Sequence, residues 1–173
     1  MKLLAMAMAF VGLTGSALAA GMLKAGDVFP AWKLTDQAGK EVSSADLAGT
    51  TYLLWFFPKA LSPGCTKEGC TLRDNYSGFE KAGVQVLGVS FDKPEANAKF
   101  VAKDHFPFRL LSDTDKRLAV EVGAADSTSR LWARRISYLV GPDGKVLQTY
   151  ADVSPAKHAT QVLADLARLQ GNK

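Results

Sequence analysis

The sequence predicts an α/β fold, with a mixed central β-sheet flanked by helices on both faces. Short apolar runs of strand length alternate along the chain with segments whose apolar residues recur at helical spacing. Residues 31–47 and 135–151 each read as two strand patterns around a glycine-containing turn, which indicates antiparallel hairpins. The chain has 173 residues and is 47% hydrophobic, which suits one domain with its own core.

Residues 1–20 are expected to form a cleaved signal peptide, and residues 21–173 a single domain. Lys2 precedes a short apolar stretch, and Ala17 and Ala19 then form an A-x-A cleavage pattern. The alternative is an uncleaved membrane anchor, but the stretch is shorter than the roughly 20 apolar residues of a spanning helix. We therefore expect an exported protein, periplasmic or fully secreted, with no membrane segment after cleavage.

The first strands of the domain are predicted from alternation and from one apolar run. Residues 31–47 alternate apolar and polar side chains around Ala38 and Gly39, which favours a hairpin of short strands. The run "TTYLLWFF", residues 50–57, is continuously apolar or aromatic and ends at Pro58. Such a run is typical of a central strand that is buried on both faces.

A helix is expected next, from about Gly64 to Lys81, with Gly83 ending it. Ser62 is of a residue type that caps helices, and Pro63 suits a first helical turn. The helix therefore starts shortly after the carboxyl end of the buried strand.

The remaining chain continues the alternation of strands and helices. We expect a strand at 84–92, a helix at 94–106, a strand at 108–114, a helix at 116–124, the hairpin at 135–151 and a final helix at 154–171. Ala98, Val101 and Ala102 form the predicted apolar face of the first of these helices, and Val162 and Leu166 belong to that of the last. This order matches a thioredoxin-like domain with an insertion.

Both cysteines of the chain, Cys65 and Cys70, fall in the helix that follows the buried strand. Free N–H groups and the dipole at a helix start stabilise an anion, so we expect Cys65 to react as a thiolate. On an ideal helix the two Cα atoms lie about 8.7 Å apart and the side chains point about 140° apart. A disulfide needs Cα atoms within about 7 Å, so the sulfurs can bond only after local unwinding.

Other roles for these residues are less favoured. A structural disulfide closing so short a loop would add little stability to a domain of this size. We expect no metal site or other cofactor, because there are only two thiols and no histidine near them in sequence. His105 and His158 are expected to be surface residues. The net charge of +4 is scattered, so we expect no nucleic-acid partner.

With these features in view, the chain resembles the Q-type peroxiredoxins, also called the bacterioferritin comigratory protein class. The matching segments are "PKALSPGCTKEGC", "VLGVSFDKPEANAKF", "FRLLSD" and "RISYLVGPDGKV". The family pattern Pro-x-x-x-Thr/Ser-x-x-Cys is met by Pro58, Ser62 and Cys65. The resemblance runs from about residue 24 to residue 169.

The resemblance implies a thiol-dependent peroxidase that reduces hydrogen peroxide and organic hydroperoxides. Cys65 would attack the peroxide and become a sulfenic acid, and Cys70 would resolve it as an intramolecular disulfide. Arg135 would stabilise the thiolate and the peroxide oxygens, Pro58 would shield the site from water, and Ser62 would offer a hydroxyl. A thioredoxin-like or glutaredoxin-like reductant is implied as partner, and a monomer as the oligomeric state.

Several assignments stay open on the sequence alone. Arg134 competes with Arg135, because only one of two neighbouring strand residues can face the site. Glu68 could orient the arginine or be an ordinary helix-surface carboxylate. Leu61 is apolar and could favour organic hydroperoxides. The alternative function is an exported thiol–disulfide oxidoreductase of thioredoxin-like fold, although that chemistry commonly uses a Cys-x-x-Cys spacing.

Overall fold

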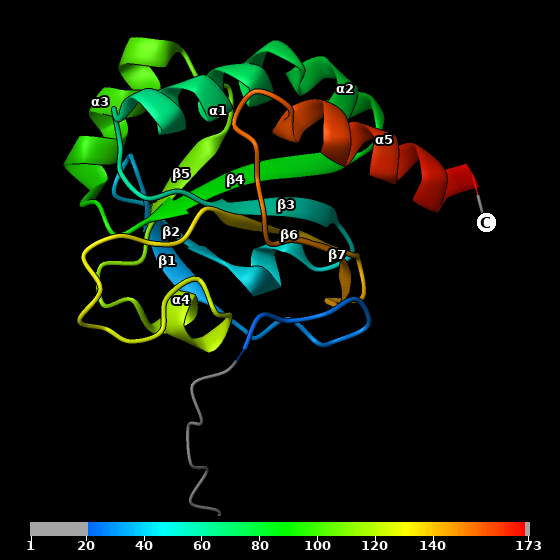
Figure 1. Cartoon of the computed structure of the whole chain (residues 1–173), viewed down its shortest axis with the longest axis horizontal. Coiled ribbons are helices and arrows are strands. Elements are labelled where there is room, and N and C mark those ends of the chain that lie inside the picture. The colour runs from blue at the N-terminus through cyan, green and yellow to red at the C-terminus, as the bar shows by residue number, and fades with distance from the viewer. Residues whose placement is uncertain (1–20, 172–173) are drawn as a thin grey trace, which may run out of the picture.

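One mixed β-sheet of seven strands runs through the computed structural model, which describes residues 21–171 (Figure 1). The strands are β1 (Lys33–Asp36), β2 (Glu41–Ser43), β3 (Thr51–Phe56), β4 (Val84–Ser90), β5 (Arg109–Ser112), β6 (Ile136–Val140) and β7 (Val146–Tyr150). The helices are η1 (Ser44–Leu47, a 3-10 turn), α1 (Pro63–Asp74), α2 (Tyr76–Lys81), α3 (Pro94–Asp104), α4 (Arg117–Glu121) and α5 (His158–Gly171).

The strand order across the sheet is β2-β1-β5-β4-β3-β6-β7. Strands β3, β4 and β5 are parallel neighbours, whereas β1–β2, β1–β5, β3–β6 and β6–β7 are antiparallel. Both predicted hairpins are present, as β1–β2 and β6–β7. The prediction of a mixed sheet is therefore confirmed.

Strand β3 lies inside the sheet because the side chains on both of its faces are mostly apolar. Leu53, Leu54, Trp55 and Phe56 are all fully buried. Alternate side chains of a strand point to opposite faces, so these four residues contribute to both cores of the molecule. The chain leaves β3 at its carboxyl end, next to the parallel end of β4, and there enters the segment that leads to α1.

Helices cover both faces of this sheet, as predicted. Helices α1, α2, α3 and α5 lie on one face, and α4 lies on the other with η1 (Figure 1). On the face covered by four helices, the apolar residues of α5 pack against the sheet together with Leu72, Phe79 and Phe100. Leu118 of α4 belongs to the opposite core.

The single helix predicted over residues 64–81 is wrong in one respect, since the structure divides it at Asn75 into α1 and α2. The backbone of Asn75 leaves helical geometry, with φ −104° and ψ 10°. Its side-chain Nδ2 donates a 2.8 Å hydrogen bond to the carbonyl oxygen of Thr71. Asparagine side chains that bond to nearby backbone in this way compete with the helix, and that competition explains the break.

The predicted apolar face of α3 is also partly wrong. Ala102 is exposed, and the buried residues of α3 are Asn97 and Phe100. The Asn97 amide faces the sheet because β5 supplies partners: Nδ2 donates to Ser112 Oγ at 3.2 Å and to the Leu111 carbonyl at 3.4 Å. A polar side chain that is fully hydrogen-bonded can occupy a position that sequence periodicity assigns to an apolar one.

The predicted signal peptide, residues 1–20, lies outside the described residues. Between residues 21 and 171, no helix combines the length and the apolar character needed to cross a bilayer.

Candidate active site

Cys65 sits in the first turn of α1, where the chain has just left the buried strand β3. Pro63 is the first residue of the helix, and the Thr66 N–H closes the first turn on the Ser62 carbonyl at 2.8 Å. The side chain of Cys65 is fully buried. Its sulfur therefore lies beside the positive end of the helix in a low-dielectric environment, where charge interactions are stronger than in water.

Arg135 reaches this sulfur from the residue just before β6. Its Nη2 donates to Cys65 Sγ at 3.4 Å, and its Nη1 is paired with Glu68 Oε2. Burial acts to lower the pKa of the Arg135 guanidinium, but Glu68 and Cys65 outweigh burial, so that the pKa is raised. Arg135 is thus a fixed cation between an acid and a thiol.

Arg134 points elsewhere. Its Nη1 donates to the Gly123 carbonyl at 3.2 Å, and its Nη2 lies 3.6 Å from Asp126. Of the two candidate arginines, the structure brings only Arg135 to Cys65.

The approach of the guanidinium depends on a glycine that the sequence reasoning did not single out. A Cβ atom at Gly64 would lie 3.1 Å from Nη2 of Arg135, which is tighter than ordinary van der Waals contact. Glycine at this position leaves room for Arg135 to lie across the start of α1.

Glu68 is not a helix-surface carboxylate, because it is fully buried between Arg135 and His158. The prediction that His158 is a surface residue is wrong: it is fully buried as well, and its Nδ1 lies 2.8 Å from Glu68 Oε1. The two atoms are at hydrogen-bond distance, but the ring is not aligned for a hydrogen bond, so the interaction is a short polar contact. His105, by contrast, is exposed, as predicted.

Ser62 occupies the capping position of α1, but its side chain makes no capping bond. Its hydroxyl instead donates to the Lys59 carbonyl at 2.9 Å, so the predicted side-chain cap is wrong in this conformation. Pro58 directly follows the buried Phe57 and is half-buried. Both residues belong to the segment between β3 and α1 that borders the reactive sulfur.

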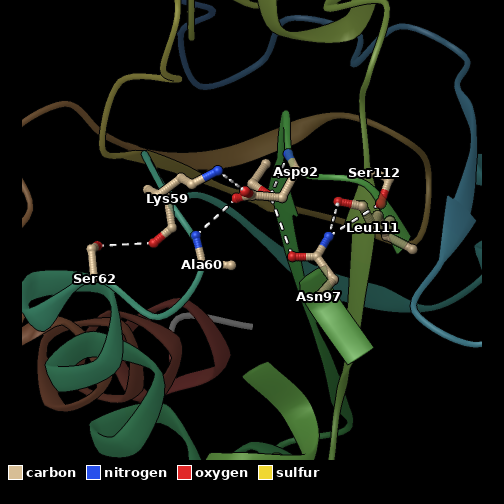
Figure 2. Close-up of polar contacts among 8 residues, drawn as sticks. Lys59, Ala60, Ser62, Asp92, Asn97, Leu111 and Ser112 are labelled. Atoms are coloured by element: carbon tan, nitrogen blue, oxygen red, sulfur yellow. Dashed lines mark hydrogen bonds and ion pairs between the residues drawn. The ribbon is translucent and has the colours of Figure 1, made fainter. Parts of the chain in front are cut away.

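This segment is anchored by a buried carboxylate, as Figure 2 shows. Asp92 accepts a 2.8 Å hydrogen bond from the Ala60 N–H and pairs with Lys59 Nζ, and its side chain is only 2% exposed. The backbone of Asp92 is bonded in turn to Ser90 Oγ at 3.2 Å. Leu61, the next residue in the segment, is held at φ 64°, in the left-handed region that leucine rarely adopts.

Comparison with known proteins now identifies the family. Residues 25–149 match the profile of the AhpC/TSA family. The chain belongs to this family. It is 41% identical over 146 residues to peroxiredoxin Bcp of Escherichia coli K12, covering 82% of this chain and 94% of that protein. It is 35% identical over 139 residues to chloroplastic peroxiredoxin Q of Gentiana triflora, covering 80% and 64% of the two chains.

Solved structures of peroxiredoxins share the fold. BcpB of Mycobacterium tuberculosis superposes with a TM-score of 0.79 at 30% identity, covering 85% of this chain and 98% of the other. The bacterioferritin comigratory protein of Xanthomonas campestris, described for its alkyl peroxide reduction activity, gives 0.76 at 30% identity, covering 86% and 97%. The resemblance to Q-type peroxiredoxins and the thioredoxin-like fold are therefore confirmed.

In this peroxiredoxin Cys70 lies on the same helix as Cys65, and both are free thiols. Cys70 is half-buried. Burial raises the pKa of its thiol, and nearby Asp104 adds to the effect while Arg73 opposes it. Burial thus favours the protonated form of the Cys70 thiol.

The site also contains residues that sequence reasoning missed. Asp92 follows strand β4, and a carboxylate after a buried strand was a signal that could have drawn attention to it. Nothing in the local sequence singles out His158, which meets Glu68 only because α5 packs against α1.

Proposed function

We propose that this peroxiredoxin is a thiol-dependent peroxidase that reduces hydrogen peroxide and organic hydroperoxides to water and alcohols. The observation that carries the proposal is the 3.4 Å contact between Arg135 Nη2 and the sulfur of Cys65 at the start of a helix. A buried thiol beside a guanidinium and free helix N–H groups is a nucleophile prepared for attack. Membership of the AhpC/TSA family supports the same reading.

In the first step the Cys65 thiolate attacks the terminal oxygen of the hydroperoxide. An S–O bond forms while the O–O bond breaks, which leaves a sulfenic acid and an alkoxide or hydroxide. The leaving oxygen takes a proton from solvent and departs as alcohol or water. Arg135 supplies the positive charge for the oxygens as negative charge builds on them.

The approach of the peroxide involves the segment that borders the sulfur. Because Cys65 is fully buried, a small hydroperoxide has to enter where Ser62 and Gly64 are half-buried. We assign Ser62 the role of a hydroxyl that turns from the Lys59 carbonyl toward the incoming oxygen, and Pro58 the role of limiting access of water.

In the second step we propose that Cys70 resolves the sulfenic acid. The Cys70 thiolate attacks the sulfur of Cys65, an S–S bond forms and the S–O bond breaks, and the oxygen leaves as hydroxide, which takes a proton from solvent to become water. The two thiols are five residues apart on α1, so the first turns of this helix have to unwind. Unwinding also exposes Cys70 and removes the burial that raises its pKa.

The catalytic cycle closes when a dithiol protein reduces the disulfide and becomes a disulfide itself. We propose a thioredoxin-like or glutaredoxin-like protein as this reductant, and a monomer as the working state. The competing function, an exported thiol–disulfide oxidoreductase, is favoured by no contact among residues 21–171.

The test is peroxide consumption by the reduced protein and by two variants, followed by mass spectrometry of the peptide that holds both cysteines. Cys65→Ser should abolish consumption. Cys70→Ser should allow one turnover and leave a sulfenic acid on Cys65 that dimedone traps. The parent protein should instead show a Cys65–Cys70 disulfide, with the loss of two hydrogen atoms. Full activity of Cys65→Ser would refute the proposal.

We propose that Leu61, which is 39% exposed next to the site, gives the enzyme a preference for organic hydroperoxides. The ratio of the rates with cumene hydroperoxide and hydrogen peroxide should fall in Leu61→Asp. Leu131→Asp, at an exposed leucine of another segment, is the matched control. An unchanged ratio in Leu61→Asp would rule out the preference.

We also propose that the protein is exported. If residues 1–20 are a cleaved signal peptide, N-terminal sequencing of the protein recovered from a periplasmic fraction should begin at Ala20 or Gly21. Recovery of the intact N-terminus from the cytoplasm alone would refute cleavage and export together.

A further inference from the structure

The buried carboxylate of Glu68 joins two partners that come from different parts of the fold. One of its oxygens, Oε2, pairs with Nη1 of Arg135, and the other, Oε1, lies 2.8 Å from Nδ1 of His158. Glu68 and His158 are both fully buried, and the Arg135 side chain is only 21% exposed. A continuous line of polar contacts therefore runs from the sulfur of Cys65 through Arg135 and Glu68 to His158.

We propose that His158 is a positioning residue for the peroxidase reaction, which holds Glu68 in place and thereby keeps the Arg135 guanidinium against the sulfur of Cys65. The inference rests on the proposed function, since it concerns the same sulfur. It adds a residue of α5 to a site otherwise built from α1, the segment before it and the residue that precedes β6.

The electrostatic reason is that Glu68 and the Cys65 thiolate share one cation. Without a second partner, the carboxylate would draw the guanidinium toward itself and weaken its hold on the sulfur. In this proposal a small rotation of the ring lets the N–H at Nδ1 point at Oε1, 2.8 Å away, so that it satisfies part of the carboxylate's charge and more of the field of Arg135 acts on Cys65. Buried charges influence one another strongly at these separations, because water does not screen them.

The surroundings of His158 offer no other charged partner at contact distance among the described residues. From β7, the ring of Tyr150 packs against the imidazole with centroids 5.6 Å apart. Burial raises the pKa of the Tyr150 hydroxyl, and Asp165 of α5 raises it further, so the phenol is neutral. From α1, Glu68 is the facing group, with Arg135 behind it. The start of α5 itself disfavours a positive charge.

Docking of α5 does not require an imidazole at this position. Helices α1 and α5 lie on the same face of the sheet (Figure 1). Thr71 Oγ1 of α1 lies 2.8 Å from the Glu68 carbonyl oxygen and 3.0 Å from that of Pro155, in the loop before α5, and its one proton can serve either acceptor. Val162 and Leu166 bury the apolar face of α5. Both ring nitrogens of His158 are buried without an aligned hydrogen-bond partner, which is costly in a core, so an apolar residue would serve a purely structural purpose better.

The test measures the ionisation of Cys65 in a Cys70→Ser background, where it is the single thiol. The pH midpoint of Cys65 alkylation by iodoacetamide is compared for the parent, His158→Leu and His158→Asn. We expect His158→Leu to raise the midpoint by about one unit, a tenfold loss of thiolate below the midpoint. His158→Asn should recover most of the shift, because its amide can place a donor near the position of Nδ1. Thermal melting of each variant reports on folding.

Two outcomes overturn the inference. An unchanged midpoint in a folded His158→Leu would show that His158 serves stability alone. If His158→Leu does not fold, His158→Gln takes its place. The longer amide of glutamine reaches toward the position of Nε2 instead of Nδ1. Equal alkylation midpoints for the Asn and Gln variants would then contradict a role for Nδ1. Failure of the proposed function is seen separately, as a parent protein whose Cys65 is not oxidised by hydrogen peroxide.

Discussion

At the scale of single residues, the proposed reactivity of Cys65 depends on its neighbours rather than on the thiol itself. The helix start supplies free N–H groups, and Arg135 supplies a cation that is fixed on the other side by Glu68. A guanidinium can serve two acceptors at once because its N–H groups form a rigid planar fork. The site therefore needs arginine in particular, and not merely a positive charge.

Arg135→Lys should lower the rate constant for oxidation of Cys65 by hydrogen peroxide about 10²-fold, measured by stopped-flow under single-turnover conditions. A lysine ammonium cannot span Glu68 and the sulfur with two parallel donors. Arg134→Lys is the matched control and should stay close to the parent, since Arg134 contacts Gly123 and Asp126 instead. Equal rates for the two variants would contradict the assignment of Arg135.

Asp92→Asn should destabilise the protein by about 1–3 kcal/mol, measured by urea denaturation. The buried carboxylate holds both Lys59 Nζ and the Ala60 N–H, and an amide cannot serve both as an acceptor (Figure 2). Asp74→Asn, which removes an exposed ion pair with Arg73, should change stability by less than about 0.5 kcal/mol. A neutral Asp92→Asn would show that the segment is held by other contacts.

Apart from Arg135, which the family resemblance supplied, the residues of the site that the sequence could predict lie close together in the chain. One short segment contains Pro58, Ser62, Cys65 and Cys70, and these residue types indicate thiol chemistry beside a hydroxyl. The contact of Glu68 with His158 joins positions 90 residues apart, and it exists because two helices pack together. Burial by tertiary packing has no signal in a local pattern, which is why His158 was predicted to be exposed.

At the scale of secondary-structure elements, α1 holds Cys65 in its first turn and Cys70 five residues later, and in the proposed mechanism it has to unwind before the two sulfurs can bond. Its position is set by close packing at Gly69, where an added Cβ would overlap the ring of Phe106. That ring cannot move aside easily, because it packs against Phe100 and stacks on Phe108 with centroids 4.8 and 5.1 Å away.

Gly69→Ala should therefore lower the free energy of unfolding by up to about 2 kcal/mol. Alanine gains about 1 kcal/mol in helix propensity, but overpacking a rigid site costs about 1–3 kcal/mol and outweighs the gain. Gly78→Ala in α2 is the control, because the nearest neighbours there are methyl groups of Leu163 that can rotate. Urea denaturation of both variants measures the difference, and a Gly69→Ala protein more stable than its parent would show that α1 can shift freely.

Most elements could be predicted from the sequence because their patterns are strong. The apolar run of β3 and the two glycine-containing hairpins appear where expected. The errors arose where a polar side chain made a specific hydrogen bond: Asn75 breaks the helix, and Asn97 turns toward β5. Such bonds depend on where the partner lies in three dimensions, which periodicity does not report.

At the scale of the whole molecule, the sheet separates two cores, and the face opposite the reactive cysteine contains its own titrating group. Burial raises the pKa of Asp113 to about 6, Asp115 adds to the shift, and a 2.8 Å hydrogen bond from the Ala119 N–H opposes it. An unfolded aspartate has a pKa of about 3.9. The folded state thus binds the proton more tightly than the unfolded state does.

The contribution of Asp113 to stability should therefore be greatest below pH 4 and should fall as the pH rises toward 6. Relative to Asp113→Asn, the parent should lose about 2–3 kcal/mol of unfolding free energy across this window, measured by urea denaturation at each pH. Asp143→Asn, which removes an exposed carboxylate, is measured in the same way as the control. A constant difference between the parent and Asp113→Asn would show that Asp113 titrates normally.

The alternation of strands and helices was enough to predict a mixed sheet covered on both faces. It did not give the order of the strands, and the placement of β1 beside β5 joins segments that are distant in the chain. That order depends on which surfaces bury each other best, and it brings β3, β4 and the start of β6 together around Cys65.

The most direct test of the account compares one thiol in two states of the same chain. In the Cys70→Ser protein, the second-order rate constant for oxidation of Cys65 by hydrogen peroxide is measured when the chain is folded and when it is unfolded in urea. The account predicts a folded rate at least about 10²–10³-fold higher, because Arg135 and the start of α1 act on the sulfur only in the folded state. Equal rates in the two states would contradict it.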